Sequence, residues 1–257
     1  MQSRDLLYRA RLGIPWVTLL LVITCFMITL PLYVDPRRFY LTLGVSFCEE
    51  DGIVHWWHYL VAHFVHGTGC PFPAFPPIGL HIGINVALFV FQGMLAERVL
   101  GAGRIALLTF TALAVQNVIE YFLIGGRGHG ASGMTWSYLL FSLQWLHWAF
   151  RRERWRMMKD WVTAVLVPLS LLAIVGLVKH WHLWNLLVSV PFFLVWRKTF
   201  AANLEALAAG RPLDRGAPRA NAAGVAAAAG LWAFNAYFLI AAIAGWIQPV
   251  VVTGPDV

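Results

Sequence analysis

Charged side chains are scarce in this sequence. Lys, Arg, Asp and Glu together make up only 12% of the 257 residues, whereas 60% are hydrophobic and the mean hydropathy is +0.68. An average soluble domain carries roughly twice that share of charged residues. The composition therefore excludes an ordinary soluble domain and predicts an integral membrane protein.

Acidic residues are scarcer than basic ones. The chain has 12 Asp and Glu against 19 Lys and Arg, and its formal net charge is +7. An excess of positive charge can indicate nucleic-acid binding, but no separate basic module is visible here. In a membrane protein Lys and Arg collect in cytoplasmic loops. We therefore expect a lipid bilayer around the chain and no nucleic-acid partner.

Cysteine is also rare, with three residues in the whole chain. Cys25 lies inside the first apolar run, and Cys48 and Cys70 flank one loop. An oxidising compartment would permit a Cys48–Cys70 disulfide, and two free thiols are the alternative. Neither an HExxH nor a CxxCH signature is found, so we expect neither metal nor organic cofactor. The apolar run from Ile14 has no convincing small-residue cleavage site after it, which favours an anchor over a removable signal.

Long apolar runs are abundant, and a helix needs about 20 such residues to cross a bilayer. Seven segments approach this length: Ile14–Tyr33, Ile78–Ala96, Ile105–Ile124, Ser132–Phe150, Trp161–Val178, Trp181–Trp196 and Ala222–Val251. In the last segment Gly224 and Gly230, separated by alanines, would let helices pack closely. The sequence predicts an all-α polytopic membrane protein.

The basic residues orient these segments. They cluster before the first segment and after the second, fourth and sixth, which places all four clusters on one, cytoplasmic, side. We expect a cytoplasmic N-terminus at 1–13, a six-helix core at 14–200, a cytoplasmic linker at 201–221, and a seventh helix with its tail at 222–257. Residues 35–79 form a long extracytoplasmic first loop. The location expected is a bacterial inner (plasma) membrane.

Polar residues occur inside three of the apolar runs, where polar groups are costly and mark function. His81 and Asn85 lie in the second segment, Ser132 stands between Gly130 and Gly133, and His182 opens the sixth segment. The expected topology places these residues at the same depth in the membrane. A serine hydroxyl becomes a nucleophile when a neighbouring base takes its proton, and neutral histidine has a suitable pKa. The glycines would let backbone and substrate approach closely.

His81 and Asn85 share a helix face and could donate hydrogen bonds to an oxyanion. The Ser132 backbone N–H, at a helix start, could do the same. Each element has a plainer interpretation as well. A serine at a helix start is commonly an N-cap, a lone histidine is commonly a satisfied core residue, and a His/Asn pair can simply bridge helices.

Taken together and in order, these motifs resemble those of the rhomboid intramembrane serine proteases over residues 55–196. The matching positions are His81-x-x-x-Asn85, Glu97-x-x-x-Gly101, Gly130-x-Ser132-Gly133 and His182, with Trp57 and His63-Phe64-Val65-His66 in the first loop. The resemblance implies a six-helix core with one added helix. It implies that Ser132 is the nucleophile and His182 the general base. Asn85, His81 and the Ser132 amide would form the oxyanion hole, and Trp136 would pack on the base.

The resemblance implies a serine endopeptidase that cleaves membrane-protein substrates with a single span, in or near a transmembrane segment. Two alternatives stay open. The first-loop histidines resemble the rhombosortase branch, which trims C-terminal sorting tails. Asn185 and Ser189 stand where the family has glycines, which favours a pseudoprotease that binds membrane proteins without cutting. His180 is a rival base, Glu120 could tune His182 or act as helix glue, and the oligomeric state is not predicted.

Overall fold

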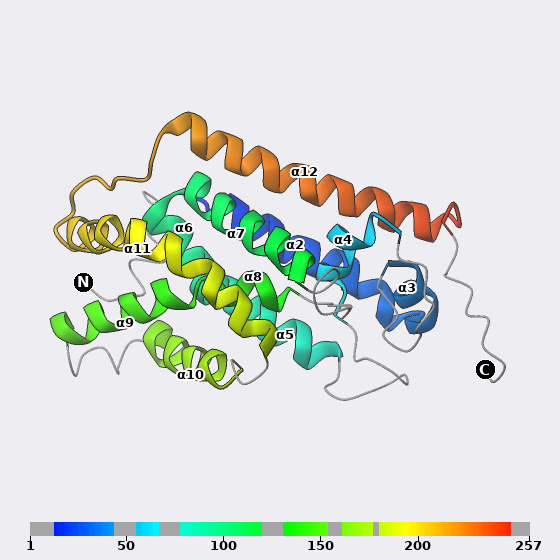
Figure 1. Cartoon of the computed structure of the whole chain (residues 1–257), viewed down its shortest axis with the longest axis horizontal. Helices are drawn as coiled ribbons and strands as arrows, with labels where there is room; N and C mark the ends of the chain where they lie inside the picture. Colours follow the sequence, from blue (N-terminus) through cyan, green and yellow to red (C-terminus); the bar gives the residue numbers. More distant parts are fainter. Residues whose placement is uncertain are drawn as a thin grey trace. The chain divides into compact units, whose positions relative to one another are not determined.

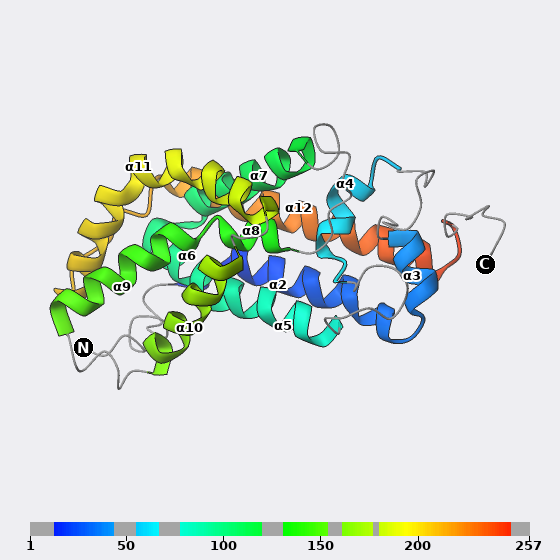
Figure 2. The same cartoon turned by 60° about the horizontal axis from the view of Figure 1, so that its bottom comes forward.

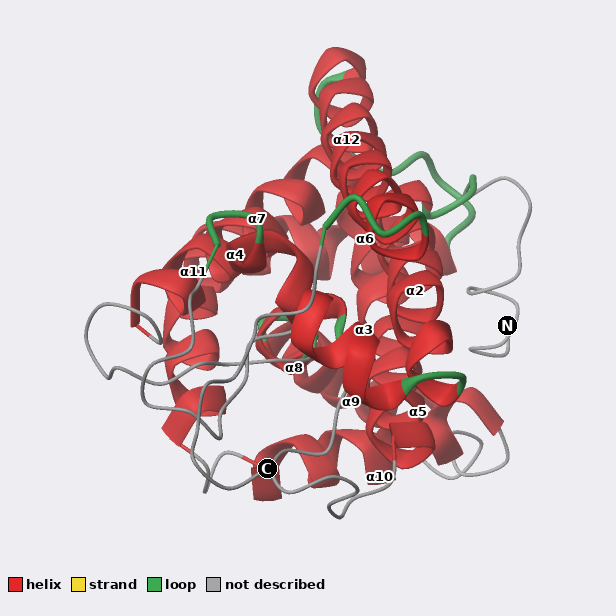
Figure 3. Cartoon of the chain, turned by 90° about the vertical axis from the view of Figure 1, so that its right-hand side faces the viewer, coloured by secondary structure: helices red, strands yellow, loops and turns green. Residues whose placement is uncertain are grey.

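The computed structural model describes residues 13–43, 55–66, 78–119, 131–153, 161–176 and 180–247. Within these ranges every regular element is a helix and no strand occurs (Figure 3). The elements are α2 (Trp16–Thr29), η2 (Leu30–Tyr33), α3 (Pro36–Leu43), α4 (His58–Val61), η3 (Ala62–Phe64), α5 (Ile78–Leu88), η4 (Phe89–Gly93), α6 (Met94–Leu100), α7 (Ala102–Asn117), α8 (Ser132–Trp136), α9 (Leu139–Glu153), α10 (Trp161–Gly176), α11 (His180–Ala208) and α12 (Pro218–Ile243). The all-helical class is therefore confirmed for the described residues.

Three of these helices are long and apolar enough to cross a membrane. They span Trp16–Tyr33, Gly79–Leu100 and Pro218–Ile243, with mean hydropathies of 2.1, 1.6 and 1.7. They correspond to the first, second and seventh expected segments and support membrane association. Within the described residues, the other four expected segments do not meet this combination of length and hydropathy. For example, α10 has 16 residues, and a turn at 137–138 separates α8 from α9.

The contacts divide the chain into two compact units. Unit 1 comprises residues 1–21, 87–116 and 132–229, and unit 2 comprises residues 22–86, 117–131 and 230–257. This division does not coincide with the expected boundary between a six-helix core and a seventh helix. Helices α2, α5, α7 and α12 each contribute residues to both units.

The core of unit 1 is built by α8, α9, α10 and α11. Helix α9 packs against α10 and α11, and α11 also packs against α8 (Figures 1 and 2). Large side chains fill this core, and Phe141 of α9 contacts Phe193 and Phe200 of α11 with ring centroids 5.4 and 5.3 Å apart. Burial of such aromatic area is the main packing contribution here. Helix α8 therefore lies against α11, which is itself packed on α9.

Helix α11 is longer than expected. The sequence predicts that the sixth segment ends near Trp196 and that a linker occupies 201–221, but the helix continues to Ala208. Residues 201–208, which the sequence places in a linker, are therefore helical in this structure. Leu204 is fully buried, and Glu205 accepts hydrogen bonds from Trp148 and Arg152 of α9.

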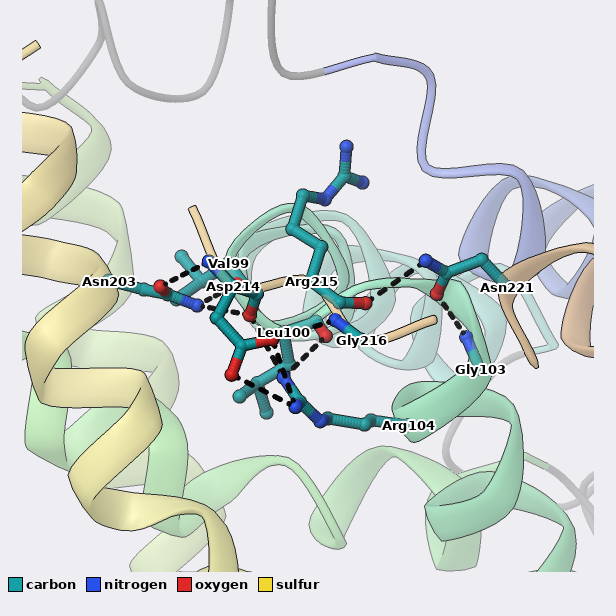
Figure 4. A network of polar contacts seen from close by, with 9 residues as sticks. All are labelled: Val99, Leu100, Gly103, Arg104, Asn203, Asp214, Arg215, Gly216 and Asn221. Atoms are coloured by element: carbon teal, nitrogen blue, oxygen red, sulfur yellow. Dashed lines mark hydrogen bonds and ion pairs between the residues drawn. The ribbon is translucent and has the colours of Figure 1, made fainter. Parts of the chain in front are cut away.

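The remaining linker, residues 209–217, is tied to unit 1 by polar contacts (Figure 4). Asn203 exchanges hydrogen bonds with the Asp214 backbone, at 2.7 and 2.8 Å, and Arg104 donates to the Asp214 carboxylate. The Gly216 N–H, together with the Arg104 guanidinium, holds the pKa of the Asp214 carboxyl below its ordinary value. The connection to α12 is therefore a fixed turn on the surface of unit 1.

The Glu97-x-x-x-Gly101 motif has a clear local role. The Glu97 carboxylate accepts hydrogen bonds from the backbone N–H groups of Val17 and Thr18, at 3.0 and 2.8 Å, at the start of α2. These N–H groups have no partner within their own helix. Gly101 ends α6 with φ = +92°, a backbone conformation that favours glycine, and a side chain there would overlap the Arg215 carbonyl.

Candidate functional site

Ser132 is the first residue of α8, at the helix start where the sequence predicts it. Helix α8 runs only to Trp136, and its neighbours are α11 and the π-helix η4. The Ser132 side chain lies outside the described part of the structure, and so does Gly130. The backbone of Ser132 and the contacts of Gly133 therefore give the position of the candidate nucleophile.

Gly133 is buried at a point where two amide side chains meet. A Cβ atom added to this residue would overlap the Gln116 Oε1 atom of α7 and would lie 2.8 Å from the Asn185 Nδ2 atom of α11. No side chain larger than hydrogen fits such a space. The lack of space at Gly133 comes from the Gln116 and Asn185 side chains, and the close approach of a substrate to this glycine stays a prediction.

His182 lies in the first turn of α11, and Asn185 follows three residues later. Residues three apart on a helix lie on the same side, so Asn185 and His182 share a face. Since Asn185 reaches Gly133, the start of α11 lies beside the start of α8. The side chains of His180 and His182 are outside the described part, so the structure does not choose between them.

Trp136 closes the other end of α8. Its side chain is buried, and its indole Nε1–H donates a 2.9 Å hydrogen bond to the Ala173 carbonyl of α10. That carbonyl belongs to the last turn of α10, where backbone acceptors have no helical partner. Trp136 therefore anchors α8 to α10. The packing of Trp136 on the His182 ring, implied by the family resemblance, stays a prediction.

His81 and Asn85 both lie on α5, in unit 2. Asn85 is only 1% exposed, and no acceptor among the described residues lies within hydrogen-bond distance of its Nδ2 atom. A buried donor without an acceptor costs about 1–3 kcal/mol. Such a donor is what a site needs if the acceptor is an oxyanion that exists only during reaction.

His66 is a fully buried residue whose contacts the sequence does not reveal. Its Nε2 atom accepts a 3.4 Å hydrogen bond from the Ala131 N–H, directly before Ser132 in the chain. Its Nδ1 atom lies 3.0 Å from both the Phe64 carbonyl and the Thr29 hydroxyl, and its ring meets the His81 ring at 5.1 Å. A backbone N–H can only donate, so His66 is held as the neutral tautomer with its proton on Nδ1.

His63 is buried beside it in the same loop. Its Nε2 atom donates to Asn117 Oδ1 at 2.6 Å, and Asn117 Nδ2 donates to the Tyr59 carbonyl at 2.8 Å. Burial lowers the pKa of His63 to about 4, and the hydrogen bond to Asn117 opposes this shift. The only signal in the sequence for both histidines is the short His63-Phe64-Val65-His66 pattern of the first loop.

Several expected features fall outside the described residues: the cysteines Cys48 and Cys70, and the acid Glu120. Within the described ranges, no group of three or more His, Cys, Asp or Glu side chains is arranged to hold a metal ion. Comparison with known protein families, with curated proteins and with solved structures gives no match to this chain. The candidate site therefore rests on its residues and their geometry.

Proposed function

We propose that this chain is an intramembrane serine endopeptidase of the rhomboid type. The observation that carries the proposal is Gly133. Its contacts with Gln116 and Asn185 bring the start of α8, where Ser132 stands, beside the start of α11, where His182 stands. A serine and a histidine on neighbouring helix starts are the two groups that covalent acyl transfer requires.

In this proposal the Ser132 hydroxyl attacks the carbonyl carbon of the scissile peptide bond while His182 takes its proton. The tetrahedral oxyanion accepts hydrogen bonds from the Ser132 amide, Asn85 and His81, in the roles that the motif resemblance implies. His182 then gives its proton to the leaving amine, and an acyl-enzyme forms on Ser132. Water, activated by His182, hydrolyses the ester and regenerates the serine.

The buried Asn85 donor supports the oxyanion role. Its Nδ2 group carries a desolvation cost in the resting protein that a negatively charged oxygen would remove. The three long apolar helices support a setting in the bilayer. The substrate class in the proposal is a membrane protein with a single span, cut from the extracytoplasmic side of a bacterial inner membrane.

Labelling with a fluorophosphonate probe, on protein purified in detergent, tests the proposal. We expect wild type to label, and Ser132→Ala and His182→Ala to lose labelling by about 10³-fold or more. Ser137→Ala is the matched control, because Ser137 is buried in the same region and its hydroxyl only bonds the Met134 carbonyl. Labelling that survives His182→Ala but not His180→Ala would assign the base to His180.

A pseudoprotease is the second candidate, because the Asn185 side chain fills the space beside Gly133 where the family resemblance implies a glycine. In that case Ser132 has no activating base at the right distance. Wild type that remains folded but does not label, under conditions that label a known serine protease, would favour this function over proteolysis.

A further inference from the structure

Two buried amides converge on the residue after the candidate nucleophile. Gln116 is the penultimate residue of α7 and is 5% exposed, and Asn185 lies in the second turn of α11 and is 1% exposed. The Gln116 Oε1 atom is an acceptor and the Asn185 Nδ2 atom is a donor, and both face the Cα of Gly133 from different helices. All three residues belong to unit 1.

Amide side chains are expensive to bury. Helices in a membrane have no hydrophobic driving force between them, so buried polar side chains are one of the few means of fixing their relative positions. A glycine at 185 would leave this position without any polar group. Asn185 instead supplies a donor, and Gln116 supplies an acceptor that reaches the same point.

The geometry also explains why Gly133 follows Ser132. Side chains at 116 and 185 occupy the volume in which a Cβ of residue 133 would lie. The start of α8 is therefore enclosed by α7 on one side and α11 on the other. A shift of either amide moves the backbone of Gly133 and, through one peptide bond, the backbone of Ser132.

We propose that Gln116 and Asn185 act as a pair that positions Ser132 for attack, in place of the direct glycine contact between helices. This inference rests on the proposed function, because its test measures the labelling of Ser132. It adds two positioning residues to the proposed catalytic site. Neither residue is placed in contact with the substrate.

A reciprocal exchange of the two side chains tests the pair. Gln116→Asn shortens the side chain at 116 by one methylene, and Asn185→Gln lengthens the side chain at 185 by one methylene. We expect each single variant to lower the maximal rate of fluorophosphonate labelling roughly ten- to hundredfold, because small displacements of reacting groups are costly. The double variant should return to within about threefold of wild type, by the non-additivity expected of contacting residues.

The readout separates positioning from general folding. The maximal inactivation rate should fall in the single variants while the half-saturating probe concentration stays the same, and thermal unfolding should show that each variant is folded. Ser189→Ala is the control, because the Ser189 hydroxyl bonds the Leu186 carbonyl of its own helix at 2.7 Å. It should label at the wild-type rate.

The outcomes distinguish the two proposals. In one outcome, wild type labels and the fold-decrease in the labelling rate of the double variant equals the product of the fold-decreases of the two single variants. That result overturns the pair and leaves the proposed function standing. Singles that label as fast as wild type overturn the pair as well. A folded wild type that does not label overturns the proposed function and, with it, the positioning role.

Discussion

At the scale of single residues, buried histidines distinguish the first loop. His63 and His66 are both fully buried, and each is tied to a segment far away in the sequence. The Nε2 atom of His63 donates a hydrogen bond and the Nε2 atom of His66 accepts one, so protonation of His66 at Nε2 would remove the acceptor of the Ala131 N–H.

His66 is expected to hold the segment that leads into Ser132. His66→Leu removes the acceptor of the buried Ala131 N–H, which costs about 1–3 kcal/mol. His66→Gln can keep an acceptor there and should retain most of the stability. The unfolding free energy and the labelling rate should fall in the first variant and largely recover in the second. Equal values for wild type and His66→Leu would contradict this role.

His63 is expected to make stability depend on pH. Its pKa is lowered to about 4 in the folded protein and is near 6.5 in an unfolded chain. Between these values the unfolded state binds a proton that the folded state does not bind. The contribution of His63 to the free energy of unfolding should therefore be fully present above pH 6.5 and be lost, by up to about 1.4 kcal/mol per pH unit, as the pH drops toward 4.

His63→Gln should remove this part of the pH dependence. The check is the thermal unfolding midpoint of wild type and variant, measured in the same detergent from pH 4 to pH 8. The difference between the two midpoints should change across that window. A constant difference would show that His63 titrates alike in the folded and unfolded states.

At the scale of helices, small residues decide which faces approach. In α12 a Cβ at Gly224 would lie 2.8 Å from the Ala102 carbonyl oxygen and 3.0 Å from the Ala106 Cβ of α7, whereas a Cβ at Gly230 would meet no atom within 4 Å among the described residues. The predicted close packing is confirmed at Gly224 and wrong at Gly230. The reason is that α7 lies against the first turns of α12, and Gly230 is exposed.

This difference predicts the effect of enlarging each glycine. Gly224→Leu should destabilise the protein by about 1–3 kcal/mol, because overpacking displaces the α7 backbone. Gly230→Leu is the matched substitution in the same helix and should cost less than about 0.5 kcal/mol. Thermal unfolding of the two variants in detergent checks this, and equal losses would argue against the α7–α12 contact.

At the scale of the whole molecule, the contacts divide the chain into two compact units, and one boundary between them falls within α12. Helix α12 illustrates why: its first turns pack through Gly224 in unit 1, and its later turns meet Trp56 through Phe234 and Phe238 in unit 2. Each half of the helix is held by different neighbours. The seventh helix is therefore a part of both units.

Much of the helical class could be predicted from composition and from the lengths of apolar runs, because both follow from the free energy of transfer into lipid. The same physics explains the limits of the seven-segment prediction. Hydropathy does not show that α11 continues to Ala208, because that turn is held by Glu205 and by the burial of Leu204 against neighbours distant in sequence.

The sequence by itself marked two glycines for a turn or a close approach: Gly101 in the Glu97-x-x-x-Gly101 motif, and Gly133 directly after Ser132. Glycine reports such a requirement locally, because no other residue satisfies it. Only the tertiary structure decided the partners: Gln116 and Asn185 around Gly133, and His66 on Ala131. A single sequence does not show which polar side chains on different helices contact each other, because these contacts depend on how the helices pack.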